Sequence, residues 1–393
     1  MKKNKKNSWL HLAEWFRSQW MNITHVVGIT IFATLLAWFI LNNLTAMSVF
    51  SFIEDSSDIE MSDIYQSMAE LKAIHQLSND ITIVSIDGYG RADVLDAINI
   101  ISEYEPAAIG LDIFFAVPEA DNSLLLSTLT DIPNVVCAAK FEKDEEGDTS
   151  HHSQQSFFED EISPLYGYVN LNASSSRDVI RDFVPFVMTA SGDTLLSMPS
   201  QLAKLCAPYK YRKLLSRGND VETIAFENIE FPIIPIQDIL SGEVAESQLT
   251  NKIILIGDLH NINDSYLSPL YEPLPGIMLH AYALQTILSG NYIDSTPKWL
   301  NWLIAILLCV VFTICNLLAK NRMENMENLF VRIVQLAMMY ILLLIGAFYF
   351  AHHHSYFDFS PAILMIGFGA VAFDVWLGIY AIYNFISNKI RKR

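Results

Sequence analysis

The segment Ile81-Thr-Ile-Val-Ser-Ile-Asp87 is the clearest indication of the fold of the central part of this chain. It is a short apolar run with several β-branched residues, and it ends in an acid. A helical pattern of apolar residues follows over residues 94–101, and a second strand-like run, Ala107-Ala-Ile-Gly-Leu-Asp-Ile-Phe-Phe115, comes next. Short apolar strands that alternate with helices of this length predict βαβ units around a largely parallel sheet covered on both faces.

The same alternation continues further along the chain. A helical pattern over residues 124–129 leads into the strand-like run 135–139. Later, Ile253-Ile-Leu-Ile-Gly257 and a helical pattern over residues 277–284 repeat the arrangement. We therefore expect a single α/β domain of about 250 residues, which is long enough to bury a substantial core.

Three parts of this region have a different texture. Residues 166–170 and 183–188 are expected to form strands of a meander or hairpin. Segment 142–163 is rich in acids, Ser, His and Gln, which is typical of a solvated loop. Segment 48–75 is expected to contain a helix that leaves the membrane.

Four other segments are long and apolar enough to cross the membrane, for which about 20 residues are needed. Lys and Arg precede the first of them, surround the loop between the second and third, and follow the fourth. Because these residues are retained on the cytoplasmic side, we expect both termini in the cytoplasm and the large domain outside the inner membrane. The expected parts are a basic leader 1–22, span 23–44, outer domain 45–297, span 298–318, inner loop 319–330, span 331–351, outer loop 352–358, span 359–386 and tail 387–393.

The first span has an alternative interpretation as a cleaved signal peptide, because both begin with a basic leader and an apolar stretch. Its apolar run is longer than the roughly 7–15 residues of a signal core, which favours an uncleaved anchor. Aromatic residues of the leader, from Trp9 to Trp20, favour a helix that lies on the inner leaflet.

The charge of the outer domain limits its partners. Residues 45–297 contain 38 Asp and Glu and 12 Lys and Arg, a formal charge of −26, while the rest of the chain sums to +8. Such a domain repels nucleic acid and bare anionic lipid. Cationic ligands, or a protein with a basic face, are the partners that this charge favours.

Several separated motifs resemble the type-two CHASE family, the extracellular sensory domain found beside cyclases and histidine kinases. The resemblance covers roughly residues 48–293, and each motif is weak alone but specific in order and spacing. The motifs are Val84-Ser-Ile-Asp87, Ile109-Gly-Leu-Asp-Ile-Phe114, Gly167-Tyr-Val-Asn170, Asp178-Val-Ile-Arg181, Val184-Pro-Phe186, Met198-Pro-Ser200, Leu255-Ile-Gly257, Pro275-Gly-Ile-Met-Leu-His-Ala281 and Leu288-Ser-Gly290.

The resemblance implies one span before the sensory domain and three after it. The family's Trp- and Pro-containing run after the first strand is reduced here to Gly88-Tyr-Gly-Arg91, which puts any ligand contact there in doubt. Family members usually continue into a cytoplasmic kinase or cyclase domain, whereas about seven residues follow the last span here. We therefore expect the output to pass to another protein.

Loops after the carboxyl ends of parallel strands form the natural ligand crevice of an α/β sheet. Asp87, Asp112 and Asp258 lie at such ends, and Asp264 and His280 are expected close by. These five residues are candidates to bind a cation or a polar ligand, and the alternative is that the acids cap helices and receive loop amides. No HExxH or CxxC spacing supports metal-assisted hydrolysis, and whether a metal is bound is left open.

Histidines and cysteines give weaker indications. His151-His152 and His352-His-His354 could bind zinc or respond to acidity, although exposed loop histidines usually do neither. Cys137 and Cys206 could form a disulfide in an oxidising compartment, but buried free thiols are the favoured interpretation.

Asp374 stands out within span four, where an isolated charge costs at least about 2.5–3.5 kcal/mol. Counting residues from the cytoplasmic ends places Tyr340 of span three at a similar depth, so a Tyr340 to Asp374 hydrogen bond is one expectation. The alternative is that Asp374 meets a partner's helix or changes protonation during signalling. Small residues nearby, Gly367, Gly369 and Ala370, offer a surface that another helix could approach closely.

The leading hypothesis is a membrane sensor that passes a ligand-dependent change through a three-helix bundle to a separate cytoplasmic or membrane effector. The second hypothesis is a scaffold subunit whose outer domain holds other envelope proteins, and an enzyme comes third. We expect no enzymatic activity and no cofactor. The ligand and the effector are unknown from the sequence, and association of several copies of the chain is left open.

Overall fold

The computed structural model of the chain describes the residues 23–41, 61–70, 76–115, 117, 122–143, 149–154, 156, 164–171, 179–189, 192–226, 229–270, 273–322 and 327–391. These residues form two units, which we call the α/β unit (Gln66–Asp294) and the membrane unit (residues up to Tyr65, together with Ser295–Arg393). The boundary between them falls inside one helix and at one short strand.

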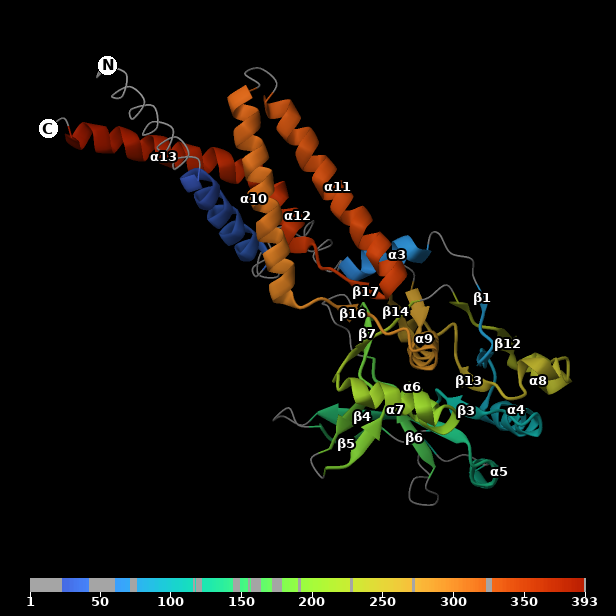
Figure 1. Ribbon diagram of the computed structural model, residues 1–393. Helices are drawn as coiled ribbons and strands as arrows, with labels where there is room; N and C mark the ends of the chain where they lie inside the picture. The colour runs from blue at the N-terminus through green and yellow to red at the C-terminus, as the bar shows by residue number, and fades with distance from the viewer. Residues whose placement is uncertain are drawn as a thin grey trace, which may run out of the picture. The chain divides into compact units, whose positions relative to one another are not determined.

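The α/β unit is built on a seven-stranded sheet in the order β12-β2-β13-β3-β4-β5, with β6 pairing with β4 (Figure 1). All its pairs are parallel except that of β4 with β5. The strands are β2 (Ile81–Ser85), β3 (Ala108–Leu111), β4 (Val135–Lys143), β5 (Thr149–Gln154), β6 (Leu165–Tyr168), β12 (Ile233–Pro235) and β13 (Ile253–Gly257). The predicted α/β fold with a mixed, largely parallel sheet is thus confirmed.

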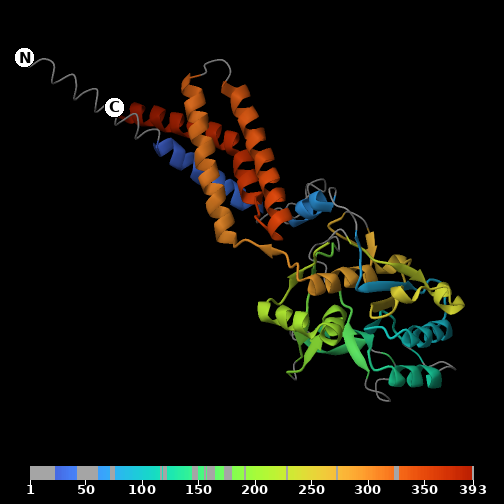
Figure 2. The same ribbon diagram turned by 45° about the vertical axis from the view of Figure 1, so that its right-hand side comes forward.

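Helices cover both faces of this sheet (Figures 1 and 2). The helices of the α/β unit are α4 (Arg91–Glu103), α5 (Asn122–Asp131), α6 (Met198–Cys206), α7 (Pro208–Arg217), α8 (Ile236–Ser241) and α9 (Gly276–Ser289), with the short 3-10 helices η2 (Glu246–Gln248) and η3 (Ile262–Asp264). One hydrophobic cluster joins the sheet to α4, α5 and α8, and another joins it to α6, α7 and α9.

Alternation along β13 shows how one strand supplies both clusters. Ile253 and Leu255 pack on the α6 and α9 side, whereas Ile254 and Ile256 pack on the α4 and α8 side, and all four are buried. Successive side chains of a strand point to opposite faces, so a strand buried on both faces reads as a continuous apolar run. This is why the sequence pattern located β2, β3 and β13 within a few residues.

Short strand pairs complete the unit, and two strands of the main sheet differ from expectation. The pairs are β1 (Gln76–Leu77) with β11 (Ile229–Glu230), β7 (Asp182–Phe183) with β10 (Glu222–Thr223), β8 (Phe186–Met188) with β9 (Thr194–Leu196), and β14 (Ser265–Leu267) with β15 (Pro273–Pro275). Segment 166–170 joins the parallel sheet as β6 instead of forming a hairpin. Segment 142–163, expected to be a loop, contains β5, which extends the ladder of β4.

The membrane unit contains four helices that are long and apolar enough to cross a membrane within the described residues, at Ile23–Leu41, Lys298–Ala319, Leu329–His353 and Gly369–Ile390. The first of these is the helix Ile23–Leu41. The other three belong to α10 (Lys298–Arg322), α11 (Glu327–His353) and α13 (Gly369–Arg391). The unit also holds the first half of α3 (Met61–Glu70), the strand β17 (Ser355–Tyr356) that α11 leads into, and the short helix α12 (Ser360–Gly367). The strand β16 (Asp294–Ser295) lies at the boundary between the units.

The expected fourth span, 359–386, is divided in the structure. Helix α12 ends at Gly367 and α13 begins at Gly369, with Phe368 between them. The buried side chain of Gln335 on α11 donates hydrogen bonds to the carbonyls of Ile366 (2.9 Å) and Gly367 (2.5 Å). A helix break leaves backbone groups without their usual partners, and inside a membrane these groups must find other hydrogen bonds. Gln335 supplies such bonds to the carbonyls at the end of α12.

Candidate functional site

The predicted acidic residues meet at the carboxyl ends of neighbouring strands. Ser85 ends β2 and lies opposite Gly257, which ends β13. Asp87 and Asp258 follow these two positions, so the parallel ladder brings them together. Their carboxyl groups are close enough to influence the pKa of each other.

Asp87 is the centre of this first group. Its carboxylate accepts hydrogen bonds from the backbone N–H of Leu259 (3.1 Å) and of His260 (3.2 Å), from the Ser85 hydroxyl, and from the His260 ring, whose Nδ1 lies 2.7 Å away. Partial burial works to raise the pKa of Asp87, but the hydrogen bonds from Asp258, Ser85 and His260 hold it well below its usual range. In turn, the hydrogen bond with Asp87 raises the pKa of Asp258.

His260 was not among the predicted site residues. Its side chain is 81% exposed, and only its Nδ1 side contacts Asp87. A histidine in a turn without a metal-ligand spacing gives no sequence signal, because its partner lies far away along the chain. The Ser85 hydroxyl contacts Asp87 and not the His260 ring, so the group lacks the serine to histidine hydrogen bond of nucleophilic catalysis.

A second, more enclosed group contains Asp112, Asp264 and His280. A β-carbon added at Gly257 would lie 3.3 Å from the Asp112 Cβ, which places Asp112 beside the end of β13. A β-carbon at Gly276, the first residue of α9, would lie 2.6 Å from a carboxylate oxygen of Asp264. Glycine at this position therefore lets a carboxylate reach the positive end of α9, one turn before His280.

Burial sets the protonation of this second group. It raises the pKa of Asp112 to about 6, against the opposing charge of Lys140. It also raises the pKa of Asp264, with a further contribution from the charge of Asp112, and lowers the pKa of His280 to about 4. His280 is 5% exposed, and burial lowers its pKa, so its ring is a neutral core group near pH 7.

All five predicted site residues thus lie near the carboxyl ends of the parallel strands, in two adjoining groups. Loop amides bound to Asp87, and the helix end met by Asp264, agree with the capping alternative. Within the described residues no three His, Cys, Asp or Glu side chains are arranged to hold a metal ion. Ligand binding by these acids stays a prediction.

The chain passes between the units for the first time inside α3. Tyr65, assigned to the membrane unit, is 1% exposed, stacks on Phe350 of α11 and donates a hydrogen bond to the Phe357 carbonyl (3.4 Å). The next residue, Gln66, is assigned to the α/β unit, is 2% exposed and accepts a hydrogen bond from the Phe226 N–H (2.9 Å). A β-carbon at Gly346 would overlap the Tyr65 ring, so glycine makes room for it on α11.

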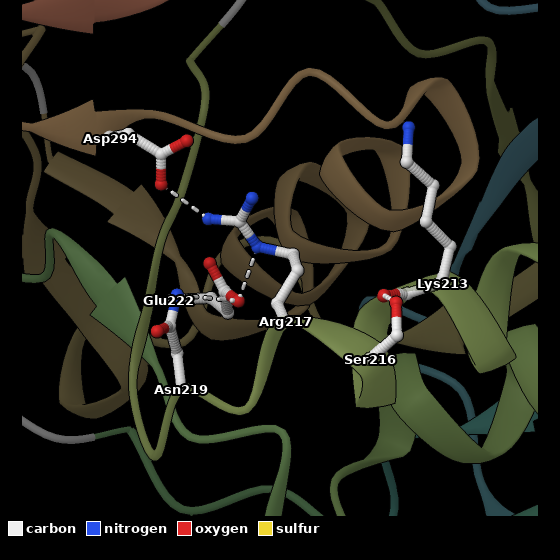
Figure 3. A network of polar contacts seen from close by, with 6 residues as sticks. All are labelled: Lys213, Ser216, Arg217, Asn219, Glu222 and Asp294. Carbon is white, nitrogen blue, oxygen red and sulfur yellow. Dashed lines mark hydrogen bonds and ion pairs between the residues drawn. The ribbon is translucent and has the colours of Figure 1, made fainter.

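The second passage follows α9, and Figure 3 shows the residues that hold it. Arg217, the last residue of α7, donates to the buried Glu222 (2.7 Å) and to Asp294 (2.5 Å), the last residue of the α/β unit. Asn219 also donates to Glu222 (3.2 Å). Beyond the boundary, Thr296 donates its backbone N–H to the Tyr356 carbonyl (3.0 Å) in the membrane unit.

The two predicted residues of the spans are not brought together. Tyr340 on α11 is 63% exposed, Asp374 on α13 is also exposed, and no hydrogen bond joins them within the described chain. Counting depth along one straight helix fails here, because the chain breaks at Phe368. The surface at Gly369, expected to be open to another helix, is covered by α10 of the same chain. A β-carbon at this position would lie 2.7 Å from the Phe312 ring. A coupling role for Tyr340 and Asp374 stays a prediction.

The cysteine and histidine candidates lie apart from these groups. Cys137 is buried and Cys206 is half-buried, both are free thiols, and they belong to the clusters on opposite sides of the sheet. His352, His353 and His354 are exposed at the end of α11, and the His352 ring hydrogen-bonds the Phe348 carbonyl (2.8 Å). His151 and His152 lie in β5, and their side chains are outside the described part of the structure, as is Asp178.

Three motifs of the predicted family have structural roles here. A β-carbon at Gly167 would lie 2.5 Å from the Met198 Cα, so glycine lets α6 pack directly on β6. Tyr168 donates to the Val184 carbonyl, and Asn170 makes two hydrogen bonds of 3.0 Å with the backbone of Phe141. These residues fix how the second half of the unit lies on the sheet.

Comparison with known proteins gives one finding. The family model described as CHASE2 domain matches residues 33–315, which is more than half of the 393 residues. No curated protein and no solved structure matches the chain.

Proposed function

Because this chain belongs to the CHASE2 domain family, we propose that its α/β unit is the extracytoplasmic sensory part of a multi-pass membrane transducer, which passes a ligand-dependent change to a separate partner protein. Among the described residues, four helices suited to crossing a membrane accompany the sensory unit. The distribution of Lys and Arg supports a location in the cell membrane with both termini in the cytoplasm. The exposed Asp374 on α13 supports a partner helix as the receiver, because an isolated carboxylate facing lipid is costly.

The observation that carries the proposal is helix α3. Two residues joined by one peptide bond, Tyr65 and Gln66, are both almost fully buried, and their side chains are fixed in different units. A helix is rigid over two adjacent residues, so Gln66 cannot be displaced without a force on Tyr65. A ligand that binds two arrangements of the α/β unit with different affinity would therefore shift the membrane unit as well.

The chain contains its own reporter for this test. All seven tryptophans lie outside residues 45–297, and Trp299 lies in the first turn of α10. Selective excitation of tryptophan therefore reports on the leader and the spans alone. We would screen small solutes for a thermal shift of the full chain in lipid nanodiscs and then measure tryptophan emission with each solute that binds.

We expect that a bound solute changes the emission, and that Gln66→Ala reduces the change without altering affinity. Gln76→Ala, the same substitution at an exposed position of β1, is the matched control. Binding that leaves the emission of the unmodified chain unchanged would contradict transmission. No binding by any solute, together with stable copurifying envelope proteins, would favour the scaffold alternative.

A further inference from the structure

A pocket of about 340 Å³ opens between α6, α7, β6 and the hairpin of β8 and β9. This volume is in the range of small-molecule sites. Three aromatic rings, those of Tyr166, Phe186 and Tyr211, form its walls together with aliphatic side chains. Its polar lining includes Gln201 and Lys204, which lie on α6.

The walls are held by the packing of α6. Its first residue, Met198, lies against Gly167 of β6, and Ser197 caps the helix by accepting a hydrogen bond from the Ser200 N–H (3.4 Å). Phe186 of β8 is paired with Leu196 of β9, directly before that cap. The pocket is therefore formed by regular elements that pack on one another.

Gln201 points to a ligand. Its side chain is 93% buried and lines the pocket, yet no described residue makes a hydrogen bond with its amide. The amide atoms themselves open into the pocket, where water or a ligand can reach them. A carboxamide both donates and accepts, so a polar group inside the pocket would satisfy it.

The local charge indicates which polar group is favoured. Helices α6 and α7 together hold five of the 12 basic residues of segment 45–297 and no acid. The ammonium of Lys204 is exposed, and within the described chain no carboxylate pairs with it. This surface is thus positive within a unit whose total charge is strongly negative.

We infer that this pocket binds a small amphipathic carboxylate, with its apolar body against Tyr166, Phe186 and Tyr211 and its carboxylate between Lys204 and the Gln201 amide. A charged carboxylate accepts a hydrogen bond from each of these donors. The inference rests on the proposed sensory function and names the class of its ligand, which is opposite in charge to the cationic class that the net charge favours.

Helix α7 connects this pocket to the second passage. Tyr211 and Leu215 line the pocket, while Lys210 on the same helix donates to the Ser289 carbonyl at the end of α9 (3.3 Å). Arg217 then binds Asp294, and its guanidinium lies 4.3 Å from the centre of the Tyr292 ring. A ligand that contacts Tyr211 therefore acts on α7, whose Arg217 binds Asp294, the last residue of the α/β unit.

Three matched solutes test the inference on the full chain in nanodiscs. Phenylacetate, phenylacetamide and phenethylamine share the aromatic body and differ in charge. We expect saturable binding of phenylacetate at millimolar concentration and at least tenfold weaker binding of the other two. Lys204→Gln and Gln201→Leu should each weaken phenylacetate binding about tenfold.

Arg212→Gln is the control, because it removes an equal charge from an exposed position of α7 that does not line the pocket. It should change affinity less than twofold. Equal binding of the acid and the amide, preference for the amine, or no effect of Lys204→Gln would overturn the inference. If phenylacetate binds as expected but tryptophan emission does not respond, the pocket stands and the proposed transmission is wrong.

Discussion

The strand-end acids and the α6–α7 pocket differ in whether their polar groups already have partners. Asp87 receives two backbone N–H groups, a hydroxyl and an imidazole, so its hydrogen-bonding capacity is filled by the chain itself. Gln201 and Lys204 have no such partners among the described residues. Clusters of acids attract attention in a sequence, but polar groups that open into a pocket and have no partner within the described chain are the better indicator of a ligand site.

The largest effect is expected where a buried charge loses its partner. Arg217→Gln leaves Glu222, which is 2% exposed, with only the Asn219 amide, and should destabilise the α/β unit by about 3 kcal/mol. Urea-dependent labelling of the buried Cys137 thiol, in a chain whose other three cysteines are serine, measures this. Arg212→Gln should have almost no effect, and similar losses for both variants would show that the network is not coupled to folding.

The next effect tests the seat of the pocket. Gly167→Ala places a methyl group 2.5 Å from the Met198 Cα, and because backbone cannot easily retreat, we expect a loss of about 2 kcal/mol and weaker phenylacetate binding. Gly90→Ala is the control, since its β-carbon would meet nothing closer than 3.8 Å. Unchanged stability of Gly167→Ala would mean that α6 does not lie directly on β6.

The acids themselves predict a pH dependence. The folded pKa of Asp112 is raised to about 6, so the stability it contributes is complete below its unfolded pKa and is lost as pH rises through about 6. Asp112→Asn should therefore stabilise the unit by about 2 kcal/mol at pH 7 and hardly at all at pH 4. Unfolding of the two chains at several pH values gives the difference directly, and a constant difference would exclude this origin.

The smallest effect on stability is expected at Gln201 itself. Gln201→Leu removes an amide that has no described partner, so stability should change by less than about 0.5 kcal/mol or rise slightly, while phenylacetate binding falls. The same labelling assay and a binding titration separate the two outcomes. A loss of more than about 1 kcal/mol would mean that Gln201 already has a structural role.

Much of the fold could be predicted because buried strands leave a continuous apolar record. The predicted run 253–257 coincides with β13, and the helical pattern over 94–101 lies within α4. β5 was missed because its residues are polar and it lies at the edge of the sheet, where burial imposes no pattern. The break at Phe368 was missed because the residues on both sides of it are mostly apolar and read as one continuous span.

The site was predictable only in part, for a related reason. Asp87 and Asp258 could be paired from strand ends, since parallel neighbours present their carboxyl ends together. His260 could not, because a turn of undefined shape carries it to Asp87. The link from Arg217 to Asp294 and the position of Gln201 depend on how α7 and α6 pack on the sheet.

The sequence alone shows which segments are apolar enough to cross a membrane and which alternate into an α/β sheet, because each buried position needs an apolar residue. It also determined the strong negative charge of segment 45–297 and the motifs of the CHASE2 family. Tertiary structure alone decided which polar groups find partners, since that depends on distances between residues far apart in the chain. It placed Tyr65 and Gln66 in different units, and it placed the Gln201 amide at a pocket, where no described residue makes a hydrogen bond with it.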